Sequence, residues 1–231
     1  MEIHGFQKMT VLDYPEHVAC TVFTAGCNFR CPFCHNAVLV TDIEDGEAYA
    51  EEDIFDYLKK RSGILDGICI TGGEPLLQKD ISDFIQKCKS LGYRVKLDTN
   101  GSFPAKLKEL VNAGLVDYVA MDVKNCREKY GETVGLPHFD TAPIEESVAF
   151  LLSGKVPFEF RTTVVGEFHT VEDIVKISEW IAGAPRYFLQ NFVDSEHLIG
   201  ENLHPASKDT LIAMRDAARK NVPPTNLRGL D

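Results

Sequence analysis

Residues 18–36 read VACTVFTAGCNFRCPFCHN, an apolar, β-branched run followed directly by a loop with three cysteines. The run over residues 18–23 predicts a short strand. Cys27, Cys31 and Cys34 follow that strand with the spacing C-x3-C-x2-C, and the proline after the second cysteine disfavours a helix there. We therefore expect a loop that wraps around a compact object at the end of the first strand.

The same strand-then-helix pattern occurs six times along the chain. The strands after residues 18–23 are expected at residues 67–70, 94–98, 116–122, 158–165 and 187–190. The helices are expected at residues 51–62, 79–91, 105–113, 144–153, 171–181 and 208–220. Right-handed crossovers between parallel strands curl the sheet, so six units predict an α/β fold, a partial (β/α)6 TIM-like barrel that is incompletely closed. The open side of such a barrel can admit a large partner.

The composition indicates one globular unit. The chain has 231 residues, of which 44% are hydrophobic, and no Pro/Gly/Ser-rich linker divides it, so residues 1–231 are expected to form a single domain. The formal net charge of -11 would repel a phosphate backbone, which argues against a nucleic-acid partner. No run is long and uncharged enough to span a bilayer and no signal-like segment begins the sequence, so we expect a cytoplasmic protein with no membrane partner.

Three of the seven cysteines fall within eight residues, which indicates a metal site rather than a disulfide framework. Iron-sulfur clusters are ordinarily bound by four thiolates, so three closely spaced cysteines leave one iron open to another ligand. The spacing favours a [4Fe-4S] cluster of this kind over a closed zinc site, which needs a second Cys or His pair. His35 would be an awkward fourth ligand because it is adjacent to Cys34. Small, buried, structural roles are expected for Cys20, Cys69 and Cys88.

With Phe33 before the last cysteine, the cysteine loop resembles the signature of the radical S-adenosylmethionine (SAM) superfamily. The resemblance implies that the amino and carboxylate groups of SAM chelate the fourth iron. It also implies that an electron from the cluster cleaves SAM to a 5'-deoxyadenosyl radical, which abstracts hydrogen. Phe33 would then lie near the adenine. On physical grounds it serves equally well as an apolar cover that limits solvent access to the cluster.

The second expected strand is followed by Gly72, Gly73 and Glu74, in the sequence TGGEPL. Glycines let a backbone approach a ligand without a Cβ clash, and a glutamate offers a carboxylate to an ammonium group. A Gly-Gly turn between a strand and a helix is by itself mostly structural. Behind the cysteine loop, however, it resembles the GGE motif of the superfamily, which implies a role in holding the SAM amino group.

The third and fourth expected strands end in DTNG, from Asp98, and DVK, from Asp122. Carboxylates at the ends of adjacent parallel strands can point into one cavity, where they would repel unless a cation or hydrogen-bond donors satisfied them. Asp98 and Asn100 could instead cap a turn. Both segments resemble the activases of glycyl radical enzymes. That resemblance implies that Asp98 and Asp122 bind SAM or a monovalent cation, that Lys124 contacts the SAM carboxylate, and that Asn100 belongs to the same site.

Arg161 lies inside the apolar fifth strand, where an unpaired charge would be costly to bury. It is expected to face the cavity toward a carboxylate, as an arginine does in the activases. Where pyruvate formate-lyase activase has a histidine after its last strand, this sequence has Gln190, Asn191 and Phe192. Gln190 is a candidate for ribose-side contacts with SAM. His169 and His197 lie in polar segments and are expected to be solvated.

Residues 5–15, GFQKMTVLDYP, together with the cysteine loop resemble an anaerobic (class III) ribonucleoside-triphosphate reductase activating protein of the longer type, and residues 226–229, NLRG, agree. This implies an oxidoreductase that removes the Cα hydrogen of a glycine in a partner protein, a glycyl radical enzyme. A flavodoxin or ferredoxin type electron donor is expected with it.

Other interpretations stay open on the sequence alone. They are a pyruvate formate-lyase activating enzyme or another activase of glycyl radical enzymes, a small-molecule radical SAM enzyme, and an electron-transfer iron-sulfur protein. No second cluster motif appears, which disfavours enzymes with auxiliary clusters. Residues 125–140 are long for a connection between a strand and a helix, so we hypothesise that they move to admit the glycine loop of the partner.

Overall fold

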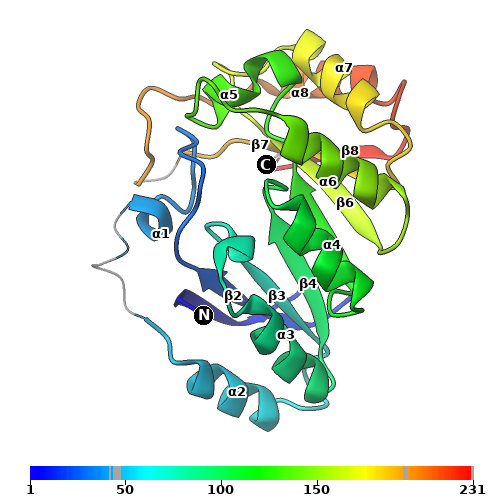
Figure 1. Cartoon of the computed structure of the whole chain (residues 1–231). Coiled ribbons are helices and arrows are strands. Elements are labelled where there is room, and N and C mark those ends of the chain that lie inside the picture. Colours follow the sequence, from blue (N-terminus) through cyan, green and yellow to red (C-terminus); the bar gives the residue numbers. More distant parts are fainter. Residues whose placement is uncertain (42, 44–47, 195–196, 230–231) are drawn as a thin grey trace.

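The computed structural model describes residues 1–41, 43, 48–194 and 197–229, which form a curved α/β fold around one eight-stranded sheet (Figure 1). The strands follow one another across the sheet in chain order: β1 (Ile3–Thr10), β2 (Ala19–Thr24), β3 (Gly67–Gly72), β4 (Arg94–Thr99), β5 (Tyr118–Asp122), β6 (Phe158–Val164), β7 (Tyr187–Asn191) and β8 (Thr225–Arg228). β1 pairs with β2 in the antiparallel direction, and every later neighbouring pair is parallel. Each parallel connection therefore crosses back outside the sheet.

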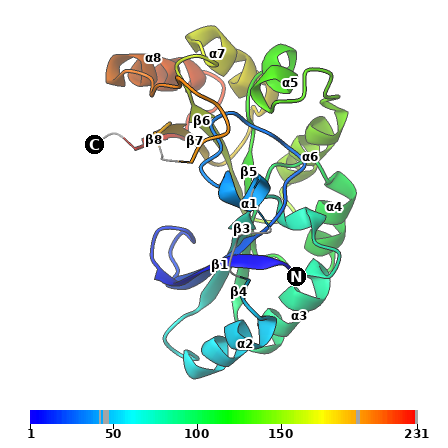
Figure 2. The same cartoon turned by 90° about the vertical axis from the view of Figure 1, so that its left-hand side faces the viewer.

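The helices of the described ranges lie in these crossovers: α1 (Val38–Thr41), α2 (Glu51–Lys60), η2 (Pro75–Leu77), α3 (Ile81–Ser90), α4 (Pro104–Asn112), η3 (Arg127–Lys129), α5 (Tyr130–Thr133), α6 (Ala142–Leu152), α7 (Val171–Trp180) and α8 (Lys208–Ala218). Figures 1 and 2 show α3, α4 and α6 along the outer face of the sheet, with α7 and α8 near its β7 and β8 end. No helix in the described ranges is long and apolar enough to cross a bilayer.

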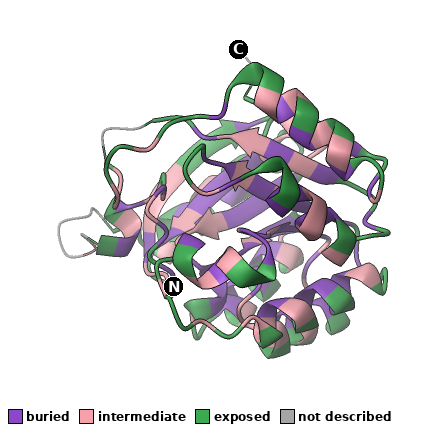
Figure 3. Cartoon of the chain, turned by 90° about the horizontal axis from the view of Figure 1, so that it is seen from above, coloured by how far each residue is buried: buried purple, intermediate pink, exposed green. Residues whose placement is uncertain are grey.

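The central strands are buried on both faces, as parallel strands covered by helices are. In β4, Val95 and Leu97 are fully buried in the apolar core cluster that also contains helix residues such as Phe84 and Leu107. Side chains alternate along a strand, so Lys96 and Asp98 point to the opposite, inner side of the curved sheet. Seen from above, the strands are largely buried and the outer turns of the helices are exposed (Figure 3). The curved sheet thus has an apolar outer layer and a polar interior.

The predicted α/β partial barrel is confirmed, and all six predicted strands and six predicted helices are present with small shifts at their ends. Two edge strands, β1 and β8, were not predicted. β1 is mostly half-buried or exposed and β8 has only four residues, so neither shows the buried apolar pattern of an inner strand. No pairing joins β1 to β8 among the described residues, so the barrel is incompletely closed, as expected.

Residues 125–140 are more ordered than the predicted loop, because they include η3 and α5. Tyr130 is fully buried and stacks on Phe139, with ring centroids 5.8 Å apart. The backbone N–H of Arg30, between the first two cysteines, donates to the carbonyl of Val134 at 2.9 Å. The segment is therefore packed against the cysteine loop, and the movement that we hypothesised for it would have to break these contacts.

Candidate functional site

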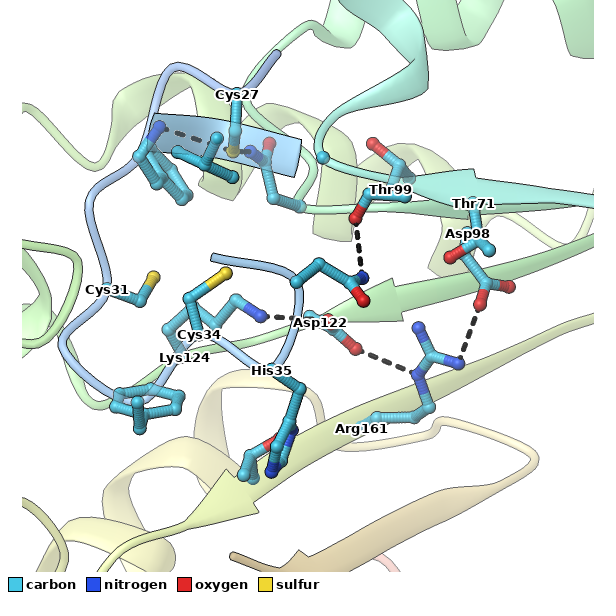
Figure 4. Close-up of a pocket in the computed structure, with 18 of the residues that line it drawn as sticks. Cys27, Cys31, Cys34, His35, Thr71, Asp98, Thr99, Asp122, Lys124 and Arg161 are labelled. Atoms are coloured by element: carbon cyan, nitrogen blue, oxygen red, sulfur yellow. Dashed lines mark hydrogen bonds and ion pairs between the residues drawn. The ribbon is translucent and has the colours of Figure 1, made fainter. Parts of the chain in front are cut away.

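A cavity of about 240 Å³ lies at the carboxyl ends of the parallel strands, between those ends and the cysteine loop (Figure 4). This is where catalytic groups gather in barrels of parallel strands. Nearly all of the predicted site residues line it: Cys27, Cys31, Phe33, Cys34, Gly72, Gly73, Asp98, Asn100, Asp122, Lys124, Arg161 and Gln190. Three threonines that we did not predict, Thr71, Thr99 and Thr163, line it as well. Thr71 and Thr163 lie near the ends of β3 and β6. Threonine is common in strands, so nothing in the sequence marked these two as site residues.

The cysteine loop is fixed to the rest of the fold at several points. Asn36 Nδ2 donates to the carbonyl of Gly72 at 2.8 Å, which ties the end of the loop to β3. The backbone N–H of Gly26 donates to the carbonyl of Leu39 at 2.8 Å, which closes the loop on itself. The sulfurs of the three cysteines face the inner side of this loop (Figure 4). Their arrangement is therefore set by backbone contacts around them.

The donor set fits an iron-sulfur cluster. Burial raises the pKa of Cys27 to about 11 and that of Cys31 to about 12, so thiolates here need compensating positive charge, which iron supplies. Within the described ranges, no three His, Cys, Asp or Glu side chains come close enough together to bind a single ion. In a [4Fe-4S] cluster each thiolate binds a different iron. The cluster therefore does not require the three sulfurs to converge on one point.

The imidazole of His35 contacts two residues that follow β7. Its Nε2 lies 2.8 Å from the carbonyl oxygen of Val193, and its ring stacks on Phe192 with centroids 5.6 Å apart. These contacts hold the ring beside the exit of β7. His35 also lines the cavity, and its exclusion as a cluster ligand stays a prediction.

Gly72 and Gly73 allow two segments of this chain to approach each other. A Cβ on Gly73 would lie 2.0 Å from the carbonyl oxygen of Gly26, and one on Gly72 would lie 2.3 Å from the backbone nitrogen of Thr24. Gly72 also has a φ of 120°, which side chains rarely permit. The pair is therefore required to place β3 against the start of the cysteine loop, whatever ligand its backbone also meets in the cavity.

Glu74 lies behind the cavity and does not line it. It is fully buried, and its carboxylate accepts from the backbone N–H groups of Leu76 and Asn100 and from the hydroxyl of Thr99 at 2.7–3.1 Å. Burial raises the pKa of Glu74 to about 7, although these three hydrogen bonds oppose the change. The carboxylate connects the ends of β3 and β4. Its contact with the SAM amino group stays a prediction.

Asp98 and Asp122 are ion-paired with Arg161 of β6, and Asp122 also with Lys124, which follows β5 (Figure 4). Arg161 donates from Nε to Asp122 Oδ1 at 2.8 Å and from Nη1 to Asp98 Oδ2 at 3.0 Å. Lys124 donates to Asp122 Oδ2 at 2.8 Å. Burial favours the protonated acids, but the charges of Arg161 and Lys124 outweigh it and hold the pKa of Asp122 below its usual range. The expectation that Arg161 faces a carboxylate is confirmed.

Asn100 both caps a turn and contacts the cysteine loop. Its Oδ1 accepts from the backbone N–H and the hydroxyl of Ser102, at 2.9 and 2.6 Å, which is the turn that the sequence suggested. Its Nδ2 donates to Oδ1 of Asn28, the residue after Cys27, at 3.0 Å. The DTNG segment is therefore linked directly to the loop that carries the cysteines.

Phe33 is 3% exposed and packs against Phe168 and His169 on the wall of the cavity. The prediction that His169 is solvated is wrong. His169 is 4% exposed, and its Nε2 lies 2.8 Å from the carbonyl oxygen of Lys124. Burial lowers its pKa, so its neutral form is favoured. The polar residues around His169 in the sequence gave no sign that its ring contacts Phe33 and the backbone of Lys124. His197 is exposed, as expected.

The lone cysteines of the inner strands and of α3 are buried as predicted. Cys20 and Cys88 are fully buried in the apolar core cluster. Cys69, on β3, is different because its Sγ lies 3.7 Å from Lys96 Nζ and 3.8 Å from Asp98 Oδ1. Lys96 was not predicted either, although its position two residues before Asp98 on the same expected strand puts the two side chains on one face.

Comparison with known proteins agrees with this site. Residues 21–181 match the family model of the Radical SAM superfamily, and this span includes all the cavity residues named above except Gln190. A Methanocaldococcus jannaschii protein, assigned by its name to the glycyl-radical enzyme activating enzymes, is 34% identical over 198 residues, which cover 82% of this chain and 79% of the relative. The pyruvate formate-lyase-activating enzyme of Listeria monocytogenes is 29% identical over 197 residues, which cover 79% of this chain and 77% of that enzyme.

Solved structures share the fold at low sequence identity. Streptococcus suis SuiB bound to S-adenosylmethionine superposes with a TM-score of 0.69 at 14% identity, over 88% of this chain but 48% of SuiB, so the chain spans about half of that protein. A domain of pyruvate-formate lyase-activating enzyme from Bacteroides vulgatus superposes with a TM-score of 0.57 at 15% identity, over 71% of this chain and 99% of that domain. The chain therefore belongs to the radical SAM superfamily, in its branch of glycyl-radical enzyme activating enzymes, and its cofactors are a [4Fe-4S] cluster and S-adenosylmethionine.

Proposed function

We propose that this enzyme generates a glycyl radical on an anaerobic (class III) ribonucleoside-triphosphate reductase, by removing one Cα hydrogen atom from a glycine of that protein. The observation that carries the proposal is the sequence of residues 5–15 together with the cysteine loop, which resembles activating proteins of those reductases. The 34% sequence identity with a protein named as a glycyl-radical enzyme activating enzyme, over 82% of this chain, supports a glycyl radical enzyme as the partner.

Residues 5–15 form most of β1 and the turn after it, beside the strand that leads into the cysteine loop. A Cβ on Gly5 would lie 3.1 Å from Phe23 of β2, so the glycine permits close pairing there. Thr21 of β2 donates its hydroxyl to Asp13 at 2.6 Å, and Tyr14 is 2% exposed. The resemblance therefore extends to residues that fix the strand from which the cluster loop begins.

When bound, the cluster and SAM supply a 5'-deoxyadenosyl radical. The residues of this chain hold the two cofactors and orient them. Cys27, Cys31 and Cys34 would ligate the cluster, and the basic groups of Lys124 and Arg161 would face the SAM carboxylate in the cavity. Gln190, on the β7 side of the cavity, would contact the ribose. The sheet is not closed into a full barrel, which leaves room for a protein loop to bring a glycine to the site.

The test is an anaerobic assay with the reconstituted enzyme, SAM, dithionite and a candidate reductase. We expect 5'-deoxyadenosine and, on the reductase, the doublet of a glycyl radical in electron paramagnetic resonance. A reductase whose radical-site glycine is replaced by alanine should give no doublet. The proposal fails if the enzyme cleaves SAM but never produces the doublet on the reductase.

The second candidate for the partner is a pyruvate formate-lyase. The Listeria monocytogenes relative that matches over 79% of this chain is named as a pyruvate formate-lyase-activating enzyme. The same assay separates the two partners when each is offered alone and then both together. A doublet on pyruvate formate-lyase and none on the reductase would establish the second candidate. Replacing dithionite by a flavodoxin or a ferredoxin, each kept reduced by its own reductase, tests the electron donor that we propose.

A further inference from the structure

Lys96 lies in the interior of the barrel, directly below the cavity. It is two residues before Asp98 on β4, so both side chains point to the same side of the sheet. Its register partners are Cys69 on β3 and Tyr118 on β5, and its side chain is 2% exposed. An ammonium group this deeply buried needs a partner of opposite charge.

The partner is Asp98, whose Oδ1 accepts from Lys96 Nζ. Burial disfavours the charged lysine, but the carboxylate of Asp98 outweighs it and raises the pKa of Lys96. The other near group is the neutral thiol of Cys69, 3.7 Å from Nζ. Lys96 therefore makes its ion pair with one carboxylate, and that carboxylate is part of the wall of the cavity.

Together, the five charged residues form a chain in which acids and bases alternate. Lys96 and Arg161 each bind one oxygen of Asp98, and Arg161 and Lys124 each bind one oxygen of Asp122. Each of the four carboxylate oxygens thus has a cationic donor, and three positive charges face two negative ones. A monovalent metal ion placed between the two aspartates would add a fourth positive charge beside only two negative ones, so these residues do not fit such an ion.

We propose that Lys96 is a positioning residue that supplies to Asp98 the positive charge that a bound monovalent metal ion would otherwise supply. The SAM site of this enzyme then works without potassium or sodium. The charge left over in the network attracts the carboxylate of SAM through Lys124 and Arg161. The inference rests on the SAM chemistry of the superfamily and is independent of which protein is the partner.

The first experiment uses the wild-type holoenzyme. SAM affinity and the rate of 5'-deoxyadenosine formation are measured in potassium chloride, sodium chloride and N-methyl-D-glucamine chloride at equal ionic strength. We expect all three salts to give the same affinity within about twofold. A loss of about tenfold or more in the organic salt, equivalent to about 1.4 kcal/mol of binding free energy, overturns the proposal.

The second experiment uses Lys96→Met, which keeps an unbranched side chain, one atom shorter, and removes its charge. Oδ1 of Asp98 then keeps only the weak thiol donor of Cys69 and has no positive charge beside it. We therefore expect SAM affinity in the organic salt to fall about tenfold or more and to recover when potassium or sodium is added. Lys155→Met, at an exposed position, is the matched control and should respond to no salt. Equal SAM affinity of Lys96→Met in all three salts, whether normal or reduced, overturns the proposal. If the variant does not fold, the wild-type comparison decides.

Discussion

Arg161 on β6 and Asp122 on β5 are register partners, and their side chains form an ion pair with 2.8 Å between Nε and Oδ1. Because Arg161 also reaches Asp98 on β4, one guanidinium joins the ends of three strands. We predict that Asp122→Asn lowers the free energy of unfolding by about 3 kcal/mol, since it leaves Lys124 and part of Arg161 without a counter-charge in a largely buried place. Urea denaturation of the two proteins measures this loss.

The exposed pair between Lys108 and Glu146, 2.7 Å apart, is the control for that prediction. Glu146→Gln should lower the free energy of unfolding by less than about 1 kcal/mol, because water screens an exposed ion pair. Equal effects of the two substitutions would mean that burial does not strengthen the Arg161–Asp122 pair.

Much of this site follows from the order of the strands. The carboxyl ends of parallel strands meet at one edge of a sheet, so the motifs after β2, β3, β4 and β5 had to lie near one another once the repeated pattern was recognised. The ion pair of Asp98 with Lys96 was not predicted: the alternation along β4 puts both side chains on one face, but the sequence does not show that their charged atoms meet. The role of Glu74 was hidden for a similar reason, since a carboxylate next to two glycines gives no sign that backbone groups will surround it.

The cluster prediction concerns the cysteines themselves. Cys34→Ser should reduce bound iron from about four atoms per chain to roughly none after anaerobic reconstitution, and should abolish 5'-deoxyadenosine formation, because the loop has no spare thiolate in reach. Iron and sulfide analysis measures the loss. Cys88→Ala, at a buried position in α3, should keep its iron, and a variant at Cys34 that binds a full cluster would contradict the ligand assignment.

Gly135 provides a test of how residues 125–140 support the cysteine loop. A Cβ there would lie 2.3 Å from the carbonyl oxygen of Arg30, between the first two cysteines, and φ is 72°. We predict that Gly135→Ala lowers the free energy of unfolding by about 1–3 kcal/mol beyond the effect of φ alone and weakens iron retention, because the alanine must push the backbone of the loop. Unfolding in urea and iron release to a chelator measure the two effects.

Gly154→Ala separates strain in φ from the clash. Gly154 has nearly the same φ, 74°, but no atom lies within 4 Å of the place that a Cβ would take there. The free energy of unfolding of Gly154→Ala should fall only by the smaller cost of an alanine in the left-handed region, about 1 kcal/mol. This variant should keep its iron. If both variants lose iron to the same extent, contact with Arg30 does not explain the requirement for glycine at position 135.

Asp173 joins residues 125–140 to α7, because its carboxylate accepts from Lys129 at 2.7 Å and from the N–H and hydroxyl of Thr170 at 2.8 and 2.7 Å. Burial opposes its charge, but these bonds outweigh burial and lower its pKa from 3.8 to about 2. The stabilisation is thus complete above pH 4 and is lost as the pH falls to 2. Asp173→Asn should therefore lower the free energy of unfolding by about 1 kcal/mol at neutral pH and by progressively less toward pH 2. Urea unfolding of the cluster-free protein measures this, with the exposed Asp209→Asn as control; a difference independent of pH would contradict the assignment.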